Sequence, residues 1–177
     1  MNKIFYTENR PEISTDAAAK KIFTEFYRIP DPEILKSETG KPFLKGSDLF
    51  FSVTHTKTLF FLAVCDCNVG IDAENLGREI DYLPILPKFS FAEREEIKNK
   101  TDFLKHWTAK ESAVKWLGGT LAADLKKISF LNGVLYYKEL QMPASVFQTE
   151  QFGHIVTLCT DRTSRQESKS EFIRFTL

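Results

Sequence analysis

The stretch VGIDAE, residues 69–74, has the apolar content of a buried strand but carries two carboxylates. Residues two apart in a strand share a face, so Asp72 and Glu74 point the same way while the apolar residues between them point into a core. Neighbouring carboxylates repel each other, and each favours water or an opposite charge. A solvent-exposed face explains this pair when it is taken alone.

A second stretch, WTAKESAVK at residues 107–115, places Glu111 in the apolar stripe of a predicted helix. Three apolar residues lie within about 60° of it on a helical wheel: Leu104, Trp107 and Val114. Burying a carboxylate there costs several kcal/mol, roughly, unless a positive charge meets it. Lys115, one turn later, would supply part of that charge as a pair on the helix surface.

The sharper interpretation is that Glu111 faces Asp72 and Glu74 across a gap between the helix and the strand. Three hard oxygen ligands, with room for water and phosphate, are typical of a Mg²⁺ site. The sequence therefore predicts Mg²⁺ here, with Mn²⁺ as a possible substitute. Lys115 would lie beside the ion, where it would receive an anion.

Two further segments offer a cationic surrounding for phosphate groups. Lys41 lies in the loop Gly40-Lys41-Pro42, and Thr54 with His55 ends a predicted strand. Alone, Lys41 is explained as a solvated lysine and His55 as a surface histidine. Only taken together do they indicate a site for phosphate groups. We expect His106 and His154 to be structural.

The composition limits the classes of partner. Lys plus Arg and Asp plus Glu both number 24 among 177 residues, so the formal net charge is zero and a nucleic-acid partner is not expected. No window approaches the ~18 apolar residues of a membrane span, and no signal peptide is evident. Three cysteines, expected as reduced strand residues, fit a cytoplasmic protein.

Hydrophobic periodicity and turn residues predict an α+β fold. Expected strands cover residues 3–7, 49–56, 58–67, 69–74, 154–161 and 171–177; helices cover 15–28, 91–99 and a span from Thr101 or Asp102 to Leu117; and a hairpin covers 126–139 with Asn132-Gly133 at its turn. Residues 30–42 and 75–90 are expected to be irregular, and 162–170 to be a polar, mobile connection. The order suggests two similar α+β halves, residues 1–75 and 76–177, in one compact unit.

The motifs GKPFL, FSVTHT, VGIDAE and WTAKESAVK occur in this order between about residues 38 and 119. In this respect the chain resembles the 4′-phosphopantetheinyl transferases, specifically the longer, pseudo-dimeric kind typified by the surfactin-synthetase activator. The resemblance implies two similar α+β halves in one chain, with coenzyme A bound in the cleft between them. It also implies transfer of 4′-phosphopantetheine from coenzyme A to a serine of an acyl or peptidyl carrier protein.

The resemblance also implies roles for individual residues. Asp72, Glu74 and Glu111 would hold Mg²⁺ against the pyrophosphate of coenzyme A. Lys115 would contact that phosphate, and Glu111 would help to deprotonate the attacking serine, directly or through metal-bound water. These two residues are therefore the expected catalytic pair.

The remaining residues implied by the resemblance would bind coenzyme A. Thr54 and His55 would bind its phosphates, and the Lys41 loop would lie along its adenine and ribose end. Thr54 replaces the commoner serine but keeps the hydroxyl group. Lys110 matches the lysine that precedes the family's glutamate. No motif places the basic residues that many relatives use for the 3′-phosphate, and the candidates are Lys20, Lys21 and Arg28.

The expected partners are coenzyme A and an apo carrier protein, bound by a monomer. Segment 75–90, with Arg78, Tyr82, Leu83 and Leu86, is either a docking rim for the carrier or an ordinary packed connector. Two alternative functions remain: a non-catalytic coenzyme A-binding or scaffolding relative, and a Mg²⁺-dependent nucleotidyl hydrolase that uses water as acceptor.

Overall fold

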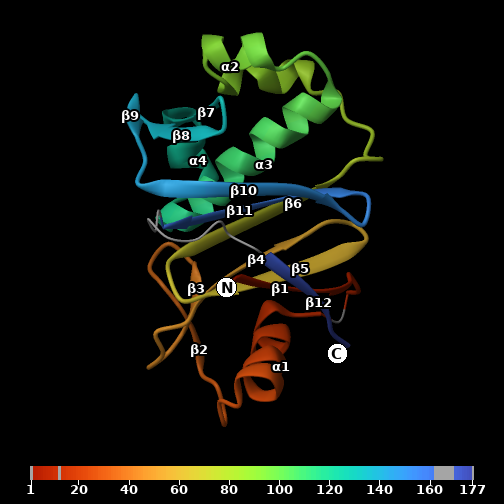
Figure 1. Cartoon of the computed structure of the whole chain (residues 1–177), viewed down its shortest axis with the longest axis vertical. Coiled ribbons are helices and arrows are strands. Elements are labelled where there is room, and N and C mark those ends of the chain that lie inside the picture. Colours follow the sequence, from red (N-terminus) through yellow and green to blue (C-terminus); the bar gives the residue numbers. More distant parts are fainter. Residues whose placement is uncertain (1, 12, 162–169, 177) are drawn as a thin grey trace.

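The fold is a stack of four layers, seen in a computed structural model that describes residues 2–11, 13–161 and 170–176. From one end to the other, the layers are α1 (Thr15–Tyr27), a four-stranded sheet, a three-stranded sheet and α3 (Lys100–Leu117) (Figure 1). The predicted α+β class is confirmed. Among the described residues, no helix has the length and apolar character needed to cross a membrane.

The first sheet has the strand order β12-β1-β5-β4. Its strands are β1 Asn2–Glu8, β4 Phe50–His55, β5 Leu59–Cys65 and β12 Ser170–Arg174. Strands β1 and β12 are parallel, and the other pairs are antiparallel. Helix α1 covers the outer face: it begins after Ser14, whose hydroxyl accepts the amide of Ala17, and ends at Arg28 in the left-handed conformation.

The second sheet has the antiparallel order β10-β11-β6. Its strands are β6 Val69–Asn75, β10 Ala144–Gln151 and β11 His154–Asp161. The edge strand β6 lies against β4 of the first sheet, where the Ile71 amide donates to the Ser52 hydroxyl at 3.1 Å. The two sheets therefore meet along β4 and β6.

The strand β6 has the two faces that its alternation predicts. Val69, Ile71 and Ala73 are buried between the sheets, against residues of β1, β5 and β11. The opposite face, with Asp72 and Glu74, is directed toward α3. This arrangement places the two carboxylates between a strand and a helix.

Strand pairing crosses the predicted boundary at residues 75 and 76. Strand β6 precedes that boundary but pairs with β11, and β12 follows it but pairs with β1. The boundary therefore does not coincide with a division between the sheets. The similarity of the two halves stays a prediction.

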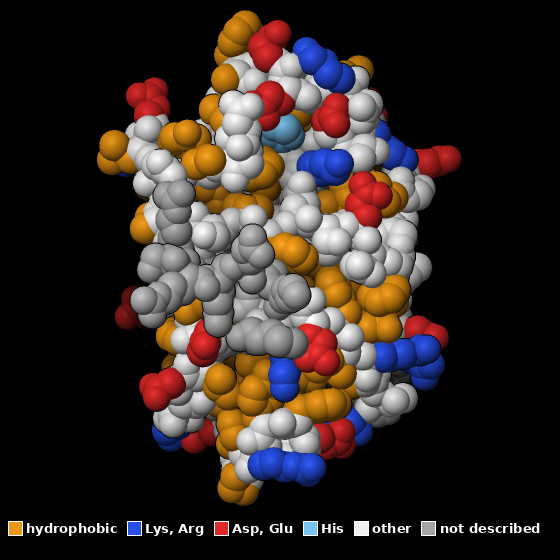
Figure 2. Space-filling model, viewed as in Figure 1, with side chains coloured by type: hydrophobic (Ala, Val, Ile, Leu, Met, Phe, Trp, Pro, Cys, Tyr) orange, Lys and Arg blue, Asp and Glu red, His pale blue; other side chains and the backbone are white. Residues whose placement is uncertain are grey.

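The shorter elements complete the chain around these layers. They are β2 Ile34–Lys36, β3 Pro42–Leu44, η1 Leu83–Lys88, α2 Phe91–Glu96, α4 Leu121–Asp124, η2 Leu125–Lys127, β7 Ile128–Leu131, β8 Val134–Tyr137 and β9 Leu140–Gln141. The predicted hairpin is present as β7 and β8, with Asn132 and Gly133 at positive φ. Acidic and basic side chains are interspersed over the face shown in Figure 2.

Several local expectations were wrong. Residues 30–42 are not wholly irregular, because β2 pairs with β3, and segment 75–90 contains the short helix η1. Helix α3 is capped by Asn99, which accepts the Asp102 amide, rather than by Thr101 or Asp102. Of the predicted polar connection at 162–170, residues 162–169 lie outside the described residues.

Candidate functional site

Helix α3 packs directly on β6 because Gly70 has no side chain. A Cβ at this position would overlap the carbonyl oxygen of Ser112 and lie 2.5 Å from the amide nitrogen of Trp116. Glycine therefore allows the helix backbone to approach the strand closely. This close contact carries Glu111 and Lys115 of the helix to the face that presents Asp72 and Glu74.

Asp72 is the centre of the polar contacts between the strand and the helix. Its side chain is 5% exposed, and its Oδ1 accepts from the Thr54 hydroxyl at 2.9 Å and from Lys115 Nζ at 2.7 Å. Lys115 also donates to the Ile71 carbonyl at 2.9 Å. The ion pair predicted as an alternative, Lys115 with Glu111 on the helix surface, is thus replaced by a pair between α3 and β6.

Glu74 has a different counter-charge. Arg78 Nη1 donates to both of its carboxylate oxygens at 2.6 Å. From the sequence, Arg78 was considered only as part of segment 75–90. Its contact with Glu74 was not expected, because a turn and not a helix brings the two side chains together. The structure adds Arg78 to the charged groups of the site.

Glu111 is the third carboxylate of the cluster, and its pKa responds to the charges of the other residues. Burial first, and then the carboxylates of Asp72 and Glu74, raise the pKa of its carboxyl to about 8, against the opposing effects of Lys115 and Arg78. Three carboxylates thus lie near two cations.

The donor chemistry of this cluster fits Mg²⁺, since all three side chains offer hard oxygen atoms. The rise in the pKa of Glu111 shows that an additional positive charge would be favoured there. Within the described ranges, however, no three His, Cys, Asp or Glu side chains form a ready metal-binding group. Lys115 and Arg78 hold the oxygens of Asp72 and Glu74 in this arrangement.

Two depressions lie beside the cluster. The larger, of about 1000 Å³, is lined by Asn9, His55, Thr56, Lys57, Thr58, Glu74, Asn75, Gly77, Arg78 and Glu79. The smaller, of about 240 Å³, is lined by Thr39, Gly40, Lys41, Pro42, Ser52, Val53, Lys115, Gly118 and Gly119. Of the predicted residues, His55 and Glu74 therefore line the first, and Lys41 and Lys115 line the second.

Lys41 also holds the end of α3. Its Nζ donates to Asn68 Oδ1 at 2.8 Å and to the Trp116 carbonyl at 3.3 Å, and Asn68 Nδ2 donates to the same carbonyl at 2.7 Å. A cation at a helix C-terminus is favourable. Burial lowers the pKa of Lys41 to about 8. Sequence motifs gave no signal for Asn68, which connects the GKP loop to the helix.

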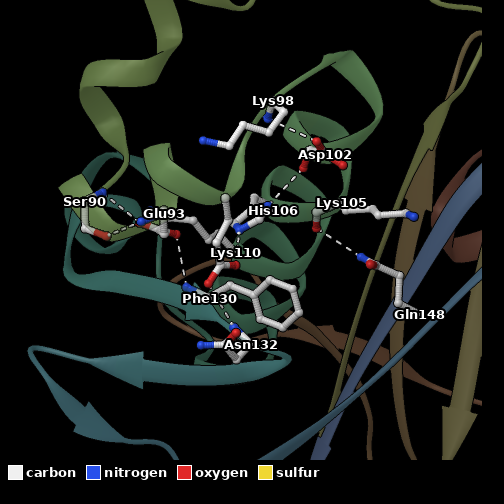
Figure 3. A network of polar contacts seen from close by, with 11 residues as sticks. Ser90, Glu93, Lys98, Asp102, Lys105, His106, Lys110, Phe130, Asn132 and Gln148 are labelled. Carbon is white, nitrogen blue, oxygen red and sulfur yellow. Dashed lines mark hydrogen bonds and ion pairs between the residues drawn. The ribbon is translucent and has the colours of Figure 1, made fainter.

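Lys110 lies away from the cluster, in the network of Figure 3. Its side chain is 1% exposed, and Nζ contacts Glu93 Oε2 and the Lys88 carbonyl, each at 3.2 Å. Burial lowers the pKa of Lys110, whereas Glu93 acts in the opposite direction. The structure thus places Lys110 in a buried ion pair, not beside the predicted coenzyme A residues. Lys20, Lys21 and Arg28 line neither of the two depressions.

Comparison with known proteins identifies the superfamily of the chain. No curated protein matches the chain. A sequence model of the 4′-phosphopantetheinyl transferase superfamily matches residues 68–159, which is more than half of the chain. The matched region contains all three carboxylates and Lys115, whereas Lys41, Thr54 and His55 precede it. By this match, the chain belongs to the 4′-phosphopantetheinyl transferase superfamily.

Proposed function

We propose that this chain transfers the 4′-phosphopantetheine group of coenzyme A to a serine of an acyl or peptidyl carrier protein, in a reaction that depends on Mg²⁺ or Mn²⁺. One observation carries the proposal: Asp72 and Glu74 on β6 lie with Glu111 and Lys115 of α3 within the region that matches the superfamily. The chemistry needs this combination, because a pyrophosphate must be bound and a hydroxyl must lose its proton.

The reaction forms a bond between the serine oxygen and the β-phosphorus of coenzyme A. The bond from that phosphorus to the bridging oxygen breaks, and 3′,5′-adenosine diphosphate leaves. Lys115, whose side chain is 30% exposed, lies beside the smaller depression and would offset negative charge on the pyrophosphate. Positioning of the two reactants supplies much of the remaining acceleration.

Glu111 is suited to accept the serine proton. In the free protein, burial and the neighbouring carboxylates raise the pKa of its carboxyl. A bound cation would act in the opposite direction and favour the ionised form, which could then accept the serine proton. Asp72, Glu74 and Glu111 would hold the metal ion. When bound, Mg²⁺ supplies positive charge at the pyrophosphate.

The proposal assigns coenzyme A to the two depressions beside the cluster. The phosphates would lie near Thr54, His55 and Lys115, and the adenine and ribose near Lys41. Thr54 is buried and donates to Asp72, so its role would be to hold that carboxylate as well as to approach the ligand. His55 is exposed in the larger depression.

The carrier protein would dock near segment 75–90. Leu83 is 64% exposed and Arg78 lies at the larger depression, which supports a surface for a partner. Tyr82 stacks on Phe103 at 5.1 Å and Leu86 packs in the same cluster, so this part of the segment is also a connector. Both interpretations of the segment therefore have support.

We further propose a cytoplasmic monomer with two related halves and the ligand cleft between them. The meeting of the sheets along β4 and β6, beside Asp72, supports a site built by one chain. Light scattering with activity measured on dilution tests this: a monomer keeps its specific activity, whereas an obligate oligomer loses it.

The test of function is incubation of the chain with coenzyme A, Mg²⁺ and a heterologous apo acyl carrier protein, followed by intact-mass measurement. We expect the carrier to gain one phosphopantetheine group, and chelator to abolish the gain. Coenzyme A binding without a gain in mass would favour the scaffolding relative. Cleavage of coenzyme A without carrier would favour the hydrolase.

A further inference from the structure

A buried histidine lies behind the larger depression, outside the carboxylate cluster. His154 begins β11, is 2% exposed and packs edge-on against Phe61 at 5.8 Å. Its ring nitrogens contact four groups from three segments of the chain, although no sequence motif indicates a role for it beyond structure. A polar side chain buried this deeply is normally retained with its hydrogen bonds satisfied.

The contacts of His154 determine which ring nitrogen carries the proton. Nδ1 lies 2.7 Å from the Phe152 carbonyl, which accepts only, so Nδ1 donates. Nε2 lies 3.3 Å from Asn75 Nδ2. The orientation of the Asn75 amide is fixed because its Oδ1 accepts the Gly77 amide at 2.7 Å. Nε2 therefore faces an N–H donor and must be an acceptor, so the ring is the neutral tautomer protonated at Nδ1.

Nε2 also faces the opposite wall of the depression. The hydroxyl oxygens of Thr56 and Thr58 lie 3.0 and 3.2 Å from it. These residues flank Lys57 and follow His55, in the turn that joins β4 to β5 of the first sheet. Asn75 ends β6 of the second sheet. One imidazole thus contacts side chains from both sheets.

Asn75, which contacts His154, is also hydrogen-bonded to Arg78. The Asn75 carbonyl accepts the Arg78 amide at 3.1 Å, which closes a turn together with the Gly77 contact. That turn carries the guanidinium of Arg78 to Glu74. Both walls, including His55, Lys57 and Arg78, line the depression of about 1000 Å³.

We propose that His154 is a positioning residue for phosphopantetheine transfer: its Nε2 sets the β4–β5 turn against the end of β6. It thereby fixes the two walls of the depression, which carry Lys57 and Arg78 beside Glu74 and Glu79 and would receive the substrate. This inference rests on the proposed function of the site. His154 touches neither the substrate nor the reacting atoms. It acts through Thr56, Thr58 and Asn75.

The test compares two substitutions at residue 154 in the full chain, with kcat and KM for coenzyme A measured separately. His154→Leu removes the acceptor, and we expect kcat/KM to fall at least about tenfold, because misplacement by about 1 Å costs up to a hundredfold. His154→Gln offers a carbonyl oxygen near the place of Nε2 and should restore most of that loss. Thr58→Val removes one exposed partner and should give a smaller loss in the same direction.

A second buried histidine provides the control. His106 Nδ1 lies 3.0 Å from the Asp102 carbonyl and Nε2 lies 3.1 Å from a carboxylate oxygen of Glu96. The ring packs edge-on against Phe130, as His154 packs against Phe61. His106→Leu should lower the melting temperature while kcat/KM of the folded protein stays near that of the wild type. Wild-type kcat/KM in His154→Leu, or an equal loss in His154→Leu and His154→Gln, would overturn the proposal.

Nuclear magnetic resonance separates this proposal from the proposed function. Long-range proton–nitrogen spectra of the free protein should show Nδ1 of His154 protonated and Nε2 bare. His154→Leu should shift the amide signals of Lys57 and Arg78 while those of α1 stay in place. A ring protonated at Nε2, or unchanged signals at both walls, would contradict the inference even if transfer occurs. Failure of the wild type to modify any carrier would instead count against the proposed function.

Discussion

Lys115 on α3 donates to Asp72 Oδ1 on β6 at 2.7 Å, and this ion pair joins the helix to the second sheet. The Asp72 side chain is 5% exposed, so its negative charge depends on groups of the protein rather than on water. Lys115 also donates to the Ile71 carbonyl of the same strand. The residue that would meet the substrate phosphate therefore also stabilises a buried carboxylate.

Substituting Lys115 by methionine tests both roles. Lys115→Met should lower the free energy of unfolding by about 1–3 kcal/mol, because it removes a charge-assisted hydrogen bond to a buried acceptor. A surface pair with Glu111 would have contributed only about 0.5 kcal/mol. The mutant should also lose most of the rise in melting temperature that coenzyme A with Mg²⁺ causes. Thermal shift with and without ligand measures both effects, and an unchanged ligand-induced rise would remove Lys115 from the binding site.

The carboxyl of Glu111 should make stability depend on pH. Its pKa is raised from 4.5 to about 8, first by burial and then by Asp72, so the folded chain keeps a proton that the unfolded chain has released. The stabilising contribution is complete below pH 4.5 and is lost as the pH rises through about 8. Urea unfolding in chelator, at about pH 5.5 and about pH 8, should show a steeper fall for the wild type than for Glu111→Gln. Equal slopes would mean that Glu111 is not buried near the other carboxylates.

The buried pair of Lys110 and Glu93 should be structural. Glu93 is 0% exposed and also accepts the amides of Ser90 and Phe130. Lys110→Met leaves this charge unpaired and should cost about 3–5 kcal/mol, whereas the double change Lys110→Met with Glu93→Gln should recover part of the loss. The coenzyme A-induced rise in melting temperature should be the same as in the wild type. A reduced ligand-induced rise, without loss of stability, would restore Lys110 to the binding site.

Gly70 should tolerate no side chain. A methyl group there meets the backbone of Ser112 and Trp116, so Gly70→Ala should destabilise the protein by about 1–3 kcal/mol or more and displace α3 from β6. Gly46→Ala is the control: nothing lies within 4 Å of its added carbon, and only its positive φ of 68° opposes the change. Denaturant unfolding of the two variants decides the point. Similar losses in both would mean that the close packing of α3 at Gly70 has no special importance.

The elements that the sequence predicted well have strong patterns. Strand β11 was expected at 154–161 and is found there, because its sequence HIVTLCTD is rich in apolar and β-branched residues and almost all of them are buried. Strand β10 was missed, since ASVFQTEQ mixes polar and apolar residues and is only partly buried along its length. The hairpin of β2 and β3 was missed because its strands have three residues each and β3 begins with Pro42.

The candidate site was predictable as a set of residue types but not as a set of contacts. The motifs predict that Asp72, Glu74 and Glu111 form one site, and Asp72 and Glu74 raise the pKa of Glu111. That the three residues bind a metal ion stays a prediction. Contacts that depend on tertiary structure could not be predicted. The hydrogen bond from Lys115 to Asp72 is one of them, because it joins a helix to a strand. Adjacent helix residues point about 100° apart, so Lys110 is directed toward α2 when Glu111 faces β6. A motif that contains both residues cannot separate these directions.

The rate at which Asp72→Ala modifies an apo carrier protein tests the central claim most directly. Intact mass would be followed over time at saturating coenzyme A and Mg²⁺, beside the wild type and the control Asp66→Ala, an exposed aspartate outside the cluster. Melting temperatures of the same samples would confirm that each variant is folded. We predict a rate at least about a hundredfold lower for Asp72→Ala and an unchanged rate for Asp66→Ala. Transfer by folded Asp72→Ala at the wild-type rate would contradict the assignment of the active site to β6 and α3.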